Sequence, residues 1–476
     1  MFRPVRSLPV LLLAVLLEAP CFAAPPPAAV PEGTPALSEA TTPARRIGLR
    51  EAIDYARAHH PTILAAVARV AASRADTKVP RALWYPTAGI TAQLFAATAN
   101  NTPGTYVTPD QFDLPRIGGT RVVSRGDWTP SASTLVGIGA RQELFDFGRI
   151  AAQAAAFDTL VDLEQQAARG DELDVTFSVE EAYFAVYSAK AILKASEDAY
   201  QRSKAHRDLA KAGVDSGLRS PIELTRADAD LTRFDIGRVK AAGGLASAQV
   251  VLAASVGVPD AALDIAEVPP TPSQLPSLAA AIQQGARRDP AILQALAGLR
   301  AAEARTRAIG AELRPDVSAT ATVSARAGGA TPSGNGLSAP GSGFLPDVPN
   351  WDIGLVLNVP LFDGTVTARE DAARARERVR AEELAAANQV EFAAIREAYV
   401  ATDVARAALP RLSSAVDAAR ANYAQAEARF TAGLGTSVEL ADAEAIRTDA
   451  EIQLALGQFE LARARARFGR TIAEGI

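Results

Sequence analysis

Few side chains in this chain of 476 residues are of a type and spacing that could carry chemistry. The three histidines, His59, His60 and His206, are too few and too scattered for a metal site. The single cysteine, Cys21, lies near the N-terminus, and no nucleophile is paired with a base. No glycine-rich loop follows a strand pattern. The sequence therefore predicts no enzyme, no metal site and no cofactor.

Two acids, Glu439 and Asp442, lie in a stretch at 432–443 that begins a helical pattern. In this stretch glycine ends one helical pattern, and Thr436, three residues before Glu439, begins the next. Thr436 and Glu439 fit a capping box, so capping alone accounts for Glu439. Asp442 lies one turn further on and is not explained by the cap. A purely structural role is also open to Asp442, because an exposed acid near the start of a helix is stabilised by the helix dipole.

An imperfect copy of this stretch occurs at 216–227. Ser220 and Glu223 repeat the capping pattern, and Pro221 takes the first helical position, where proline is tolerated. Arg226 stands where the second copy has Asp442. Both stretches are predicted to be tips of helical hairpins, and the two tips differ in charge.

The rest of the chain is duplicated around these tips. Pro61 and Pro86 recur at unchanged spacing as Pro290 and Pro315, and the tripeptides Glu-Ala-Tyr and Leu-Phe-Asp recur further along. A repeat of this size indicates a tandem architecture. The predicted boundaries are a first repeat at 47–258, a linker at 259–275 and a second repeat at 276–472.

Each repeat is predicted to contain a helix, two strands, one very long helix and a shorter return helix. Apolar spacing places the helices of the first repeat at 49–83, 148–214 and 221–256, and the long and return helices of the second at 365–430 and 437–472. The first and return helices together match the long helix in length, which predicts a cylinder of helices projecting from the strand end. Pro410 is expected to kink the second long helix.

Period-two alternation predicts four amphipathic strands, around 88–94, 136–144, 317–323 and 353–361. A soluble sandwich would suit them, but their length of about ten residues also fits a membrane barrel. Aromatic residues bound the strands, as at a membrane interface: Trp84, Phe145 and Phe362 at one end, Trp128 and Trp351 at the other. Plugging the ends of a soluble core is the alternative role for them. Four strands cannot close a barrel around water, so a membrane barrel must be shared between chains.

The N-terminus resembles a secretory signal at 1–23, with cleavage after Ala23. Glu18 and Pro20 suit lipoprotein processing at Cys21 poorly. Residues 24–46 are rich in Pro and Ala and are expected to form an extended, poorly ordered leader. The net charge of −5 gives no basic field for nucleic acid. We find no later stretch apolar enough for a transmembrane helix.

These features together resemble the outer-membrane efflux proteins, the TolC-like channels. The resemblance covers 47–472 and rests on the order and duplication of Leu-x-x-Ala-Ile-x-x-Ala before His-Pro or Asp-Pro, Leu-Phe-Asp after the second strand, and Gly-Leu-x-[Ser/Thr]-x-x-Glu-Leu at the tips. It implies a mainly α-helical protein with a membrane β-barrel. It further implies a homotrimer in the outer-membrane lipid, with twelve barrel strands and a helical tunnel through the periplasm.

The resemblance also assigns candidate sites and partners. It implies an acidic pore constriction at Glu439 and Asp442. It implies docking of a periplasmic adaptor (membrane fusion) protein, which connects to an inner-membrane pump or exporter, at Gly217, Leu218, Ser220, Gly433, Leu434 and Thr436. Gly435 replaces the family's basic residue, so a salt-bridge lock is not expected there.

Three functions follow as hypotheses. The first is a passive exit duct for drugs and toxic small molecules in a tripartite efflux pump. The second is the outer-membrane component of a type I protein or peptide secretion system. The third, from another class, is a periplasmic coiled-coil scaffold or adaptor, which needs one hairpin and has no need of duplicated lipid-facing strands.

Overall fold

The structure is a computed structural model that describes residues 45–97, 131–266, 275–328 and 348–474. All of these residues belong to one unit, Ala44–Ile476. The predicted signal, most of the leader, and Trp128 lie outside the described residues.

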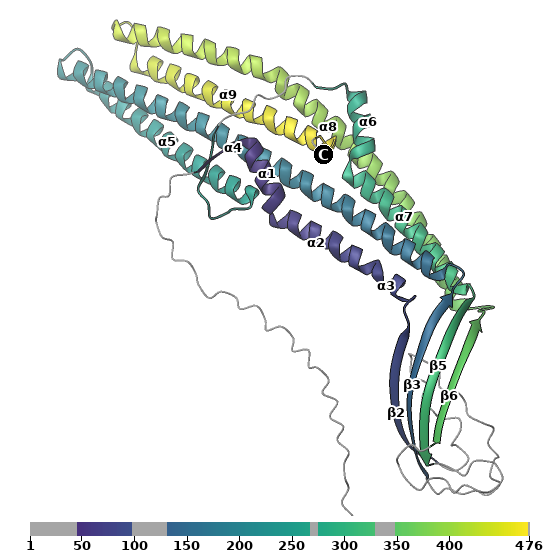
Figure 1. The fold of residues 1–476 in the computed structure, drawn as a ribbon. Helices are drawn as coiled ribbons and strands as arrows, with labels where there is room; N and C mark the ends of the chain where they lie inside the picture. Colours follow the sequence, from purple (N-terminus) through teal and green to yellow (C-terminus); the bar gives the residue numbers. More distant parts are fainter. Residues whose placement is uncertain (1–44, 98–130, 267–274, 329–347, 475–476) are drawn as a thin grey trace, which may run out of the picture. The chain divides into compact units, whose positions relative to one another are not determined.

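The same series of elements occurs twice along the chain (Figure 1). The first series comprises α1 (Leu49–His59), α2 (Pro61–Asp76), α3 (Lys78–Ala82), β2 (Thr87–Ala97), β3 (Ser131–Phe145), α4 (Arg149–Asp215) and α5 (Pro221–Val256). The second comprises α6 (Leu278–Arg288), α7 (Pro290–Gly310), the short 3₁₀ helix η2 (Ala311–Leu313), β5 (Asp316–Gly328), β6 (Val348–Asn358), α8 (Gly364–Thr431) and α9 (Ser437–Thr471). The four long and return helices match their predicted ranges to within one or two residues.

The predicted single helix at 49–83 is wrong, because it is divided into α1, α2 and α3. The first break is at His60, whose backbone is extended (φ −65°, ψ 129°). Proline disfavours the helical conformation in the residue before it, and Pro61 follows. The second series breaks in the same way at Asp289, before Pro290.

The four predicted strands form one antiparallel sheet in the order β2-β3-β5-β6. The register aligns Ile90 with Ile138, Ile138 with Val323 and Val323 with Trp351, so apolar side chains share one face. That face is exposed and includes Ile90, Leu94, Ile138, Val323, Ile353, Leu355 and Leu357. The opposite face carries small residues, among them Gly137, Gly139, Thr320, Thr322 and Ser324. Within the described residues β2 and β6 each pair on one side only.

A second, two-stranded sheet was not predicted. β1 (Arg45–Ile47) pairs in parallel with β4 (Leu263–Ile265). Two residues that we assigned to the leader, Arg45 and Arg46, therefore lie in a strand, and the linker at 259–275 contributes the other. Strands of three residues are too short to show a period of two, which is why the sequence gives no signal for them.

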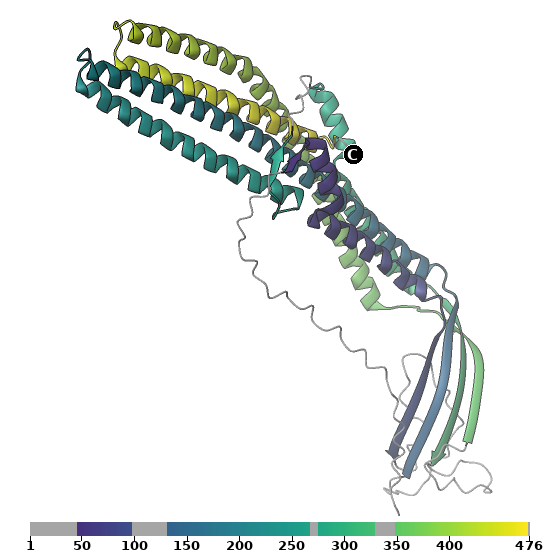
Figure 2. The same cartoon turned by 60° about the vertical axis from the view of Figure 1, so that its left-hand side comes forward.

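Most of the described helices pack against α4, whereas α8 packs on α7 and α9 (Figures 1 and 2). α1, α2, α3 and α5 contact it from the first series, and α7 and α9 from the second. The main core lies where α1, α4, α5 and the small sheet meet, around Val179, Tyr183 and Leu252. A second core joins Ala281, Ile395 and Phe468. The end-to-end placement of the first and return helices against the long helix is thus confirmed in the first series.

Two further expectations concern α5 and α8. Contrary to the sequence analysis, α5 is long and apolar enough in composition to cross a membrane. In its most apolar 18-residue segment, 17% of the residues are buried. The alanines, glycines and valines of α5 account for its high hydropathy. The helix packs along α4 as the return arm of a hairpin. Pro410 lies inside α8, which continues through it as one helix. The local kink remains a prediction.

Candidate functional site

The two hairpin tips have the same backbone geometry. Gly217 and Gly433 adopt φ values of +72° and +73°. In the first tip the amides of Leu218 and Arg219 donate to the carbonyl of Gly213, at 2.9 and 3.0 Å. In the second tip the amides of Leu434 and Gly435 donate to the carbonyl of Arg429 in the same way, at 2.9 and 3.0 Å. A residue in the left-handed conformation at a helix end lets the following amides bond to otherwise unpaired carbonyls. Glycine adopts this conformation without the steric cost of a Cβ atom.

The two helix starts after the tips differ. Thr436 accepts a hydrogen bond from the amide of Glu439 at 3.2 Å, as the capping pattern predicts. Ser220 makes no such side-chain bond, so the predicted cap in the first copy is wrong. Glu223 instead forms an ion pair with Arg219 at 2.8 Å.

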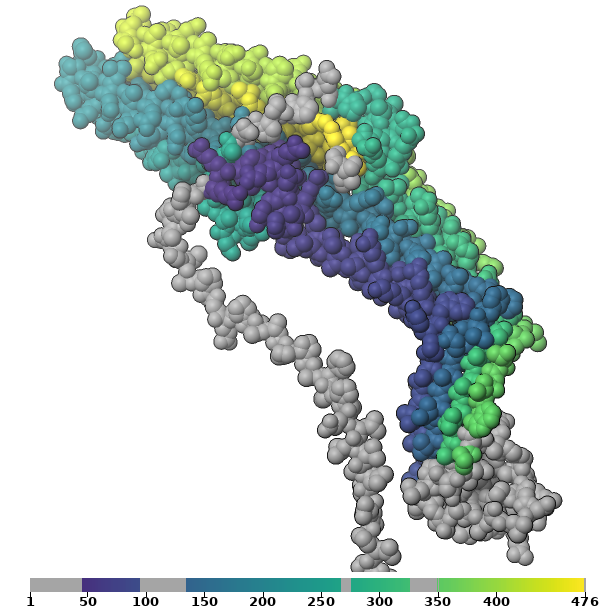
Figure 3. Space-filling view, viewed as in Figure 1, coloured from purple at the N-terminus to yellow at the C-terminus, as the bar shows by residue number. Residues whose placement is uncertain are grey.

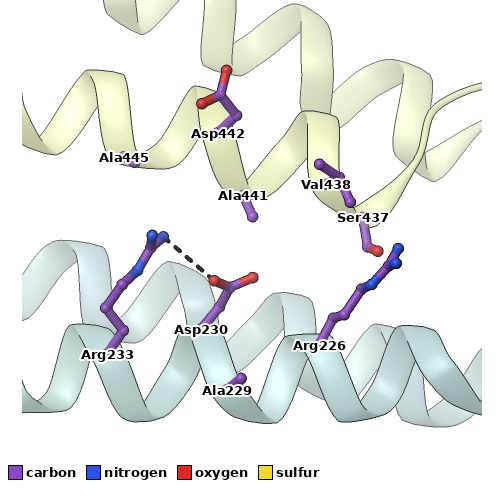
Figure 4. A pocket seen from close by; sticks show the side chains of 9 residues that line it. All are labelled: Arg226, Ala229, Asp230, Arg233, Ser437, Val438, Ala441, Asp442 and Ala445. Atoms are coloured by element: carbon purple, nitrogen blue, oxygen red, sulfur yellow. Dashed lines mark ion pairs between the residues drawn. The ribbon is translucent and has the colours of Figure 1, made fainter.

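The structure separates the two candidate acids. The Glu439 carboxylate lies 3.4 Å from the guanidinium of Arg429. Asp442 is exposed on α9 and forms no ion pair with any described residue. It borders a groove of about 330 Å³ between α5 and α9. In Figure 4, Arg226 and Arg233 extend from α5 toward this groove, whereas the Asp442 carboxylate points away from α5.

The predicted docking residues lie at the surface. Leu218 and Leu434 occupy equivalent places in the two tips and are 84% and 77% exposed. Figure 3 shows the α8–α9 hairpin alongside the α4–α5 hairpin, so both tips end at the same side of the molecule. Both tip leucines are therefore accessible to solvent, and their docking role remains a prediction.

Residues that the sequence analysis missed join the two hairpins just behind the tips. Arg202 of α4 donates to the carboxylate of Glu444 on α9 through both Nε and Nη2, at 2.8 to 3.0 Å. Glu444 is buried, and Thr448 also donates to it at 3.1 Å. A carboxylate in a helical sequence carries no signal of burial, so only the packing of α4 on α9 reveals the pair.

The described aromatic residues lie at both ends of the large sheet. Trp84 precedes β2, Phe145 ends β3 and Phe362 follows β6, all at the helical end. Trp351 lies near the opposite end, three residues into β6. All four side chains are exposed. Their membrane-interface role remains a prediction.

The histidines are placed separately. His59 stacks on Tyr55 with ring centroids 4.3 Å apart, and His60 caps α2 by accepting from the amide of Thr62. His206 is buried in α4 near the first tip. Across the part of the chain that the structure describes, no three His, Cys, Asp or Glu side chains gather as metal ligands.

The duplicated hairpins and the sheet with an exposed apolar face agree with a known family. Residues 52–258 and 281–472 match the family described as outer membrane efflux protein. The chain belongs to this family. Its members are outer-membrane channels, so the protein resides in the outer membrane, with its helical tunnel in the periplasm.

Individual relatives and solved structures share 28% sequence identity or less with this chain in the three comparisons that follow. The efflux protein is 28% identical to Protein CyaE of Bordetella pertussis over 393 residues, covering 81% of this chain and 76% of CyaE. It is 27% identical over 280 residues to the fusaric acid resistance protein FusA of Burkholderia cepacia, covering 53% of this chain and 49% of FusA. The crystal structure of the CmeC outer membrane channel of Campylobacter jejuni aligns at a TM-score of 0.69 and 15% identity, over 90% of this chain and 86% of CmeC. The structural likeness shows the shared fold, an α-helical tunnel joined to a β-barrel.

Proposed function

We propose that this efflux protein is the passive exit duct of a tripartite pump for toxic small molecules. An inner-membrane pump supplies the energy and a periplasmic adaptor connects the two, while the protein itself catalyses no reaction. The observation that carries the proposal is the sheet: its apolar face is exposed, its other face is small and polar, and helical hairpins extend from one end. Such a sheet suits lipid on one side and a water-filled lumen on the other.

The open edges of the sheet support a homotrimer. β2 and β6 are the outer strands of a four-stranded sheet. Unpaired strand edges are not tolerated in lipid, because their backbone groups would lack hydrogen bonds. Pairing β2 of one copy with β6 of the next closes the sheet, and three copies supply the twelve strands of the expected barrel.

The tips suit adaptor docking. They share one turn geometry, and each presents an exposed leucine, Leu218 or Leu434. An adaptor that binds one tip through an apolar contact therefore meets a similar surface at the other.

Asp442 suits the pore constriction better than Glu439. Its carboxylate is exposed and unpaired among the described residues, whereas Glu439 is held by Arg429. Three copies of Asp442 around a symmetry axis would form an acidic ring, which favours cations over anions.

The name of FusA favours small molecules as cargo, since it denotes resistance to fusaric acid. Export of a protein or peptide through the same duct is the alternative. The scaffold hypothesis is not retained, because an adaptor needs no duplicated strands with an apolar outer face.

The experiment compares a deletion strain with a complemented strain. Deletion should lower the tolerated concentration of several toxic organic compounds, fusaric acid among them, and the protein should fractionate with the outer membrane as a heat-modifiable trimer. A soluble monomer would overturn the duct, and loss of a secreted protein without altered tolerance would favour the alternative.

The constriction is tested in planar bilayers with purified protein. Asp442→Ala should reduce the preference for cations and weaken block by multivalent cations by several-fold, because the ring loses three charges. Glu439→Ala is the matched control and should have the smaller effect, because Glu439 is already paired with Arg429. Equal effects of both variants would argue against a constriction at Asp442.

A further inference from the structure

The two hairpin tips are joined by a contact centred on Phe430. This side chain, near the end of α8, is fully buried between Leu440 and Ala443 of its own hairpin and residues of the other hairpin. The His206 ring of α4 meets it edge to face, with centroids 4.7 Å apart and planes at 77°. The Arg219 guanidinium carbon lies 3.7 Å from the centroid of the same ring, and Arg219 Nη2 donates to the Phe430 carbonyl at 2.9 Å. We call His206, Arg219 and Phe430 the tip clasp.

The tip clasp joins the ends of two hairpins that also pack on each other through α4 and α9. Its first two members belong to the α4–α5 hairpin and its third to the α8–α9 hairpin, and α5 touches α9 only slightly. Release of Phe430 would remove the aromatic and cation contacts between the two tips, while α4 and α9 stay packed behind them. The ion pair between Arg202 of α4 and Glu444 of α9 also joins the two hairpins, at a point further from the tips than the tip clasp.

His206 is the unusual member of the clasp. Its side chain is 9% exposed, and its Nε2 atom has no hydrogen-bond partner among the described residues. The Ser203 hydroxyl, one turn earlier, is also buried without a described partner. A neutral imidazole is tolerable in such a site, whereas an imidazolium would be a buried charge with no acceptor.

The charged groups around His206 form no hydrogen bond with its Nε2 atom. Those that face it are Arg202 of α4, Arg219 of the first tip, Glu223 and Asp230 of α5, and Glu444 of α9, together with the phenol of Tyr423 of α8. Each of the three carboxylates is already in an ion pair: Glu223 with Arg219 at 2.8 Å, Asp230 with Arg233 at 3.4 Å, and Glu444 with Arg202 at 2.8 Å. An imidazolium would lie beside two guanidinium groups.

We propose that His206 makes the tip clasp a pH-sensitive latch, in which the neutral ring holds Phe430 and its protonation releases the second tip. Burial lowers the pKa of His206 below its ordinary value of 6.5, the Arg219 charge acts in the same direction, and Asp230 and Glu223 oppose it. In a released tip the side chain is hydrated and regains its ordinary pKa. The released form therefore binds the proton more tightly than the closed form.

The direction of the effect follows from this difference. The clasp has its full stability above about pH 6.5, loses stability as the pH falls below that value, and reaches a floor below the lowered pKa. One proton changes the ratio of released to closed tips by at most about tenfold per pH unit. The consequence for transport, a duct whose periplasmic end loosens in acid, rests on the proposed function; the latch itself does not.

The latch is tested by a distance measurement between the tips. Leu218→Cys and Leu434→Cys carry spin labels on exposed side chains, and Cys21→Ser ensures that the single native cysteine is absent even where the predicted signal is not cleaved. Labelled full-length protein is diluted with unlabelled protein so that each assembly contains one labelled copy. We expect one narrow distance at pH 7.5 and a several-fold larger population of longer distances at pH 5.

Substitutions at His206 decide the interpretation. His206→Phe preserves an aromatic contact with Phe430 but cannot be protonated, so it should keep the narrow distance at both pH values. His206→Gln serves the same purpose if the phenylalanine variant fails to fold. His59→Gln, at an exposed histidine of α1, should retain the full response. A distance that ignores pH, or a response that persists in both His206 variants, overturns the latch.

This measurement is independent of the duct. Spin-label distances in solubilised protein require no conduction, so a protein that forms no pores can still show the latch. Conversely, normal pores with pH-independent distances would leave the proposed function intact and remove the latch.

Discussion

Glu444 shows how one side chain can hold two hairpins together. It lies on α9, is 2% exposed, and accepts from both Nε and Nη2 of Arg202 on α4. Thr448 supplies a further hydrogen bond, and the Tyr423 ring lies 5.8 Å from the Arg202 guanidinium carbon. Charge-assisted, two-point pairing of this kind is stronger than a neutral hydrogen bond. Removing one partner leaves the other charge poorly compensated.

Glu444→Ala is therefore expected to destabilise the protein by about 3 kcal/mol or more, the usual cost of breaking a buried ion pair. Glu383→Ala is the matched control, because its pair with Arg380 is about half exposed on both sides and should contribute at most about 1 kcal/mol. Thermal unfolding followed by circular dichroism in detergent measures both. Similar shifts for the two variants would contradict the structural importance of Glu444.

A double substitution separates charge from packing. Arg202→Met with Glu444→Leu removes both charges, and apolar residues of similar volume often replace a buried pair without loss. The double variant should recover most of the stability that Glu444→Ala loses. Failure to recover would mean that the geometry of the pair, and not its charge balance, holds α4 to α9.

The helical hairpins owe their ends to short sequence signals. The amides after Gly217 and Gly433 cap the last carbonyls of α4 and α8, and this requires a left-handed residue at each tip. The helix breaks at His60 and Asp289 likewise follow from the prolines after them. These features are local, so each hairpin could be predicted before its neighbours were known.

Gly433→Ala tests the tip geometry. No atom lies within 4 Å of the added Cβ, so any cost comes from the left-handed backbone, about 1–2 kcal/mol. Gly237→Ala is the control: its Cβ also meets open space, but Gly237 is inside α5, where alanine should stabilise by up to about 1 kcal/mol. Thermal unfolding should show opposite signs, and matching signs would contradict the assigned backbone conformations.

The complete assembly depends on the two faces of the large sheet. The apolar face is exposed in one chain, and among the described residues the edge strands β2 and β6 each pair on one side only. Both features are costly in water, and both are resolved together if copies of the chain close a barrel in lipid.

Ile353→Lys tests the direction of the faces. A lysine on the lipid side should cost about 2–4 kcal/mol near the bilayer centre and reduce the amount of assembled protein in the outer membrane. Thr320→Lys places the same charge on the opposite face of the neighbouring strand, where the lumen is expected, and should be tolerated better. Immunoblots of heat-modifiable trimers in membrane fractions measure both, and equal loss would argue against a lipid-facing side at Ile353.

Periodicity, proline and glycine positions, and the internal duplication predicted the long helices, the return helices, the four strands and both tips. These properties are set by residues close together in the chain, whose apolar spacing and turn chemistry act locally. The candidate acids Glu439 and Asp442 were assigned by the family resemblance, through their distance from Gly433. Their different surroundings were not, because the Arg429 partner of Glu439 is known only once the tip has folded.

Tertiary structure decided which distant side chains meet. The pairing of β1 with β4, the Arg202–Glu444 ion pair and the burial of Phe430 between His206 and Arg219 each join residues far apart in sequence. Such contacts depend on the register and rotation of one long helix against another, and alanine-rich helices look alike in many registers. The sequence therefore specifies the parts and their order, whereas the packing of α4 against α9 selects the residues that hold the tips together.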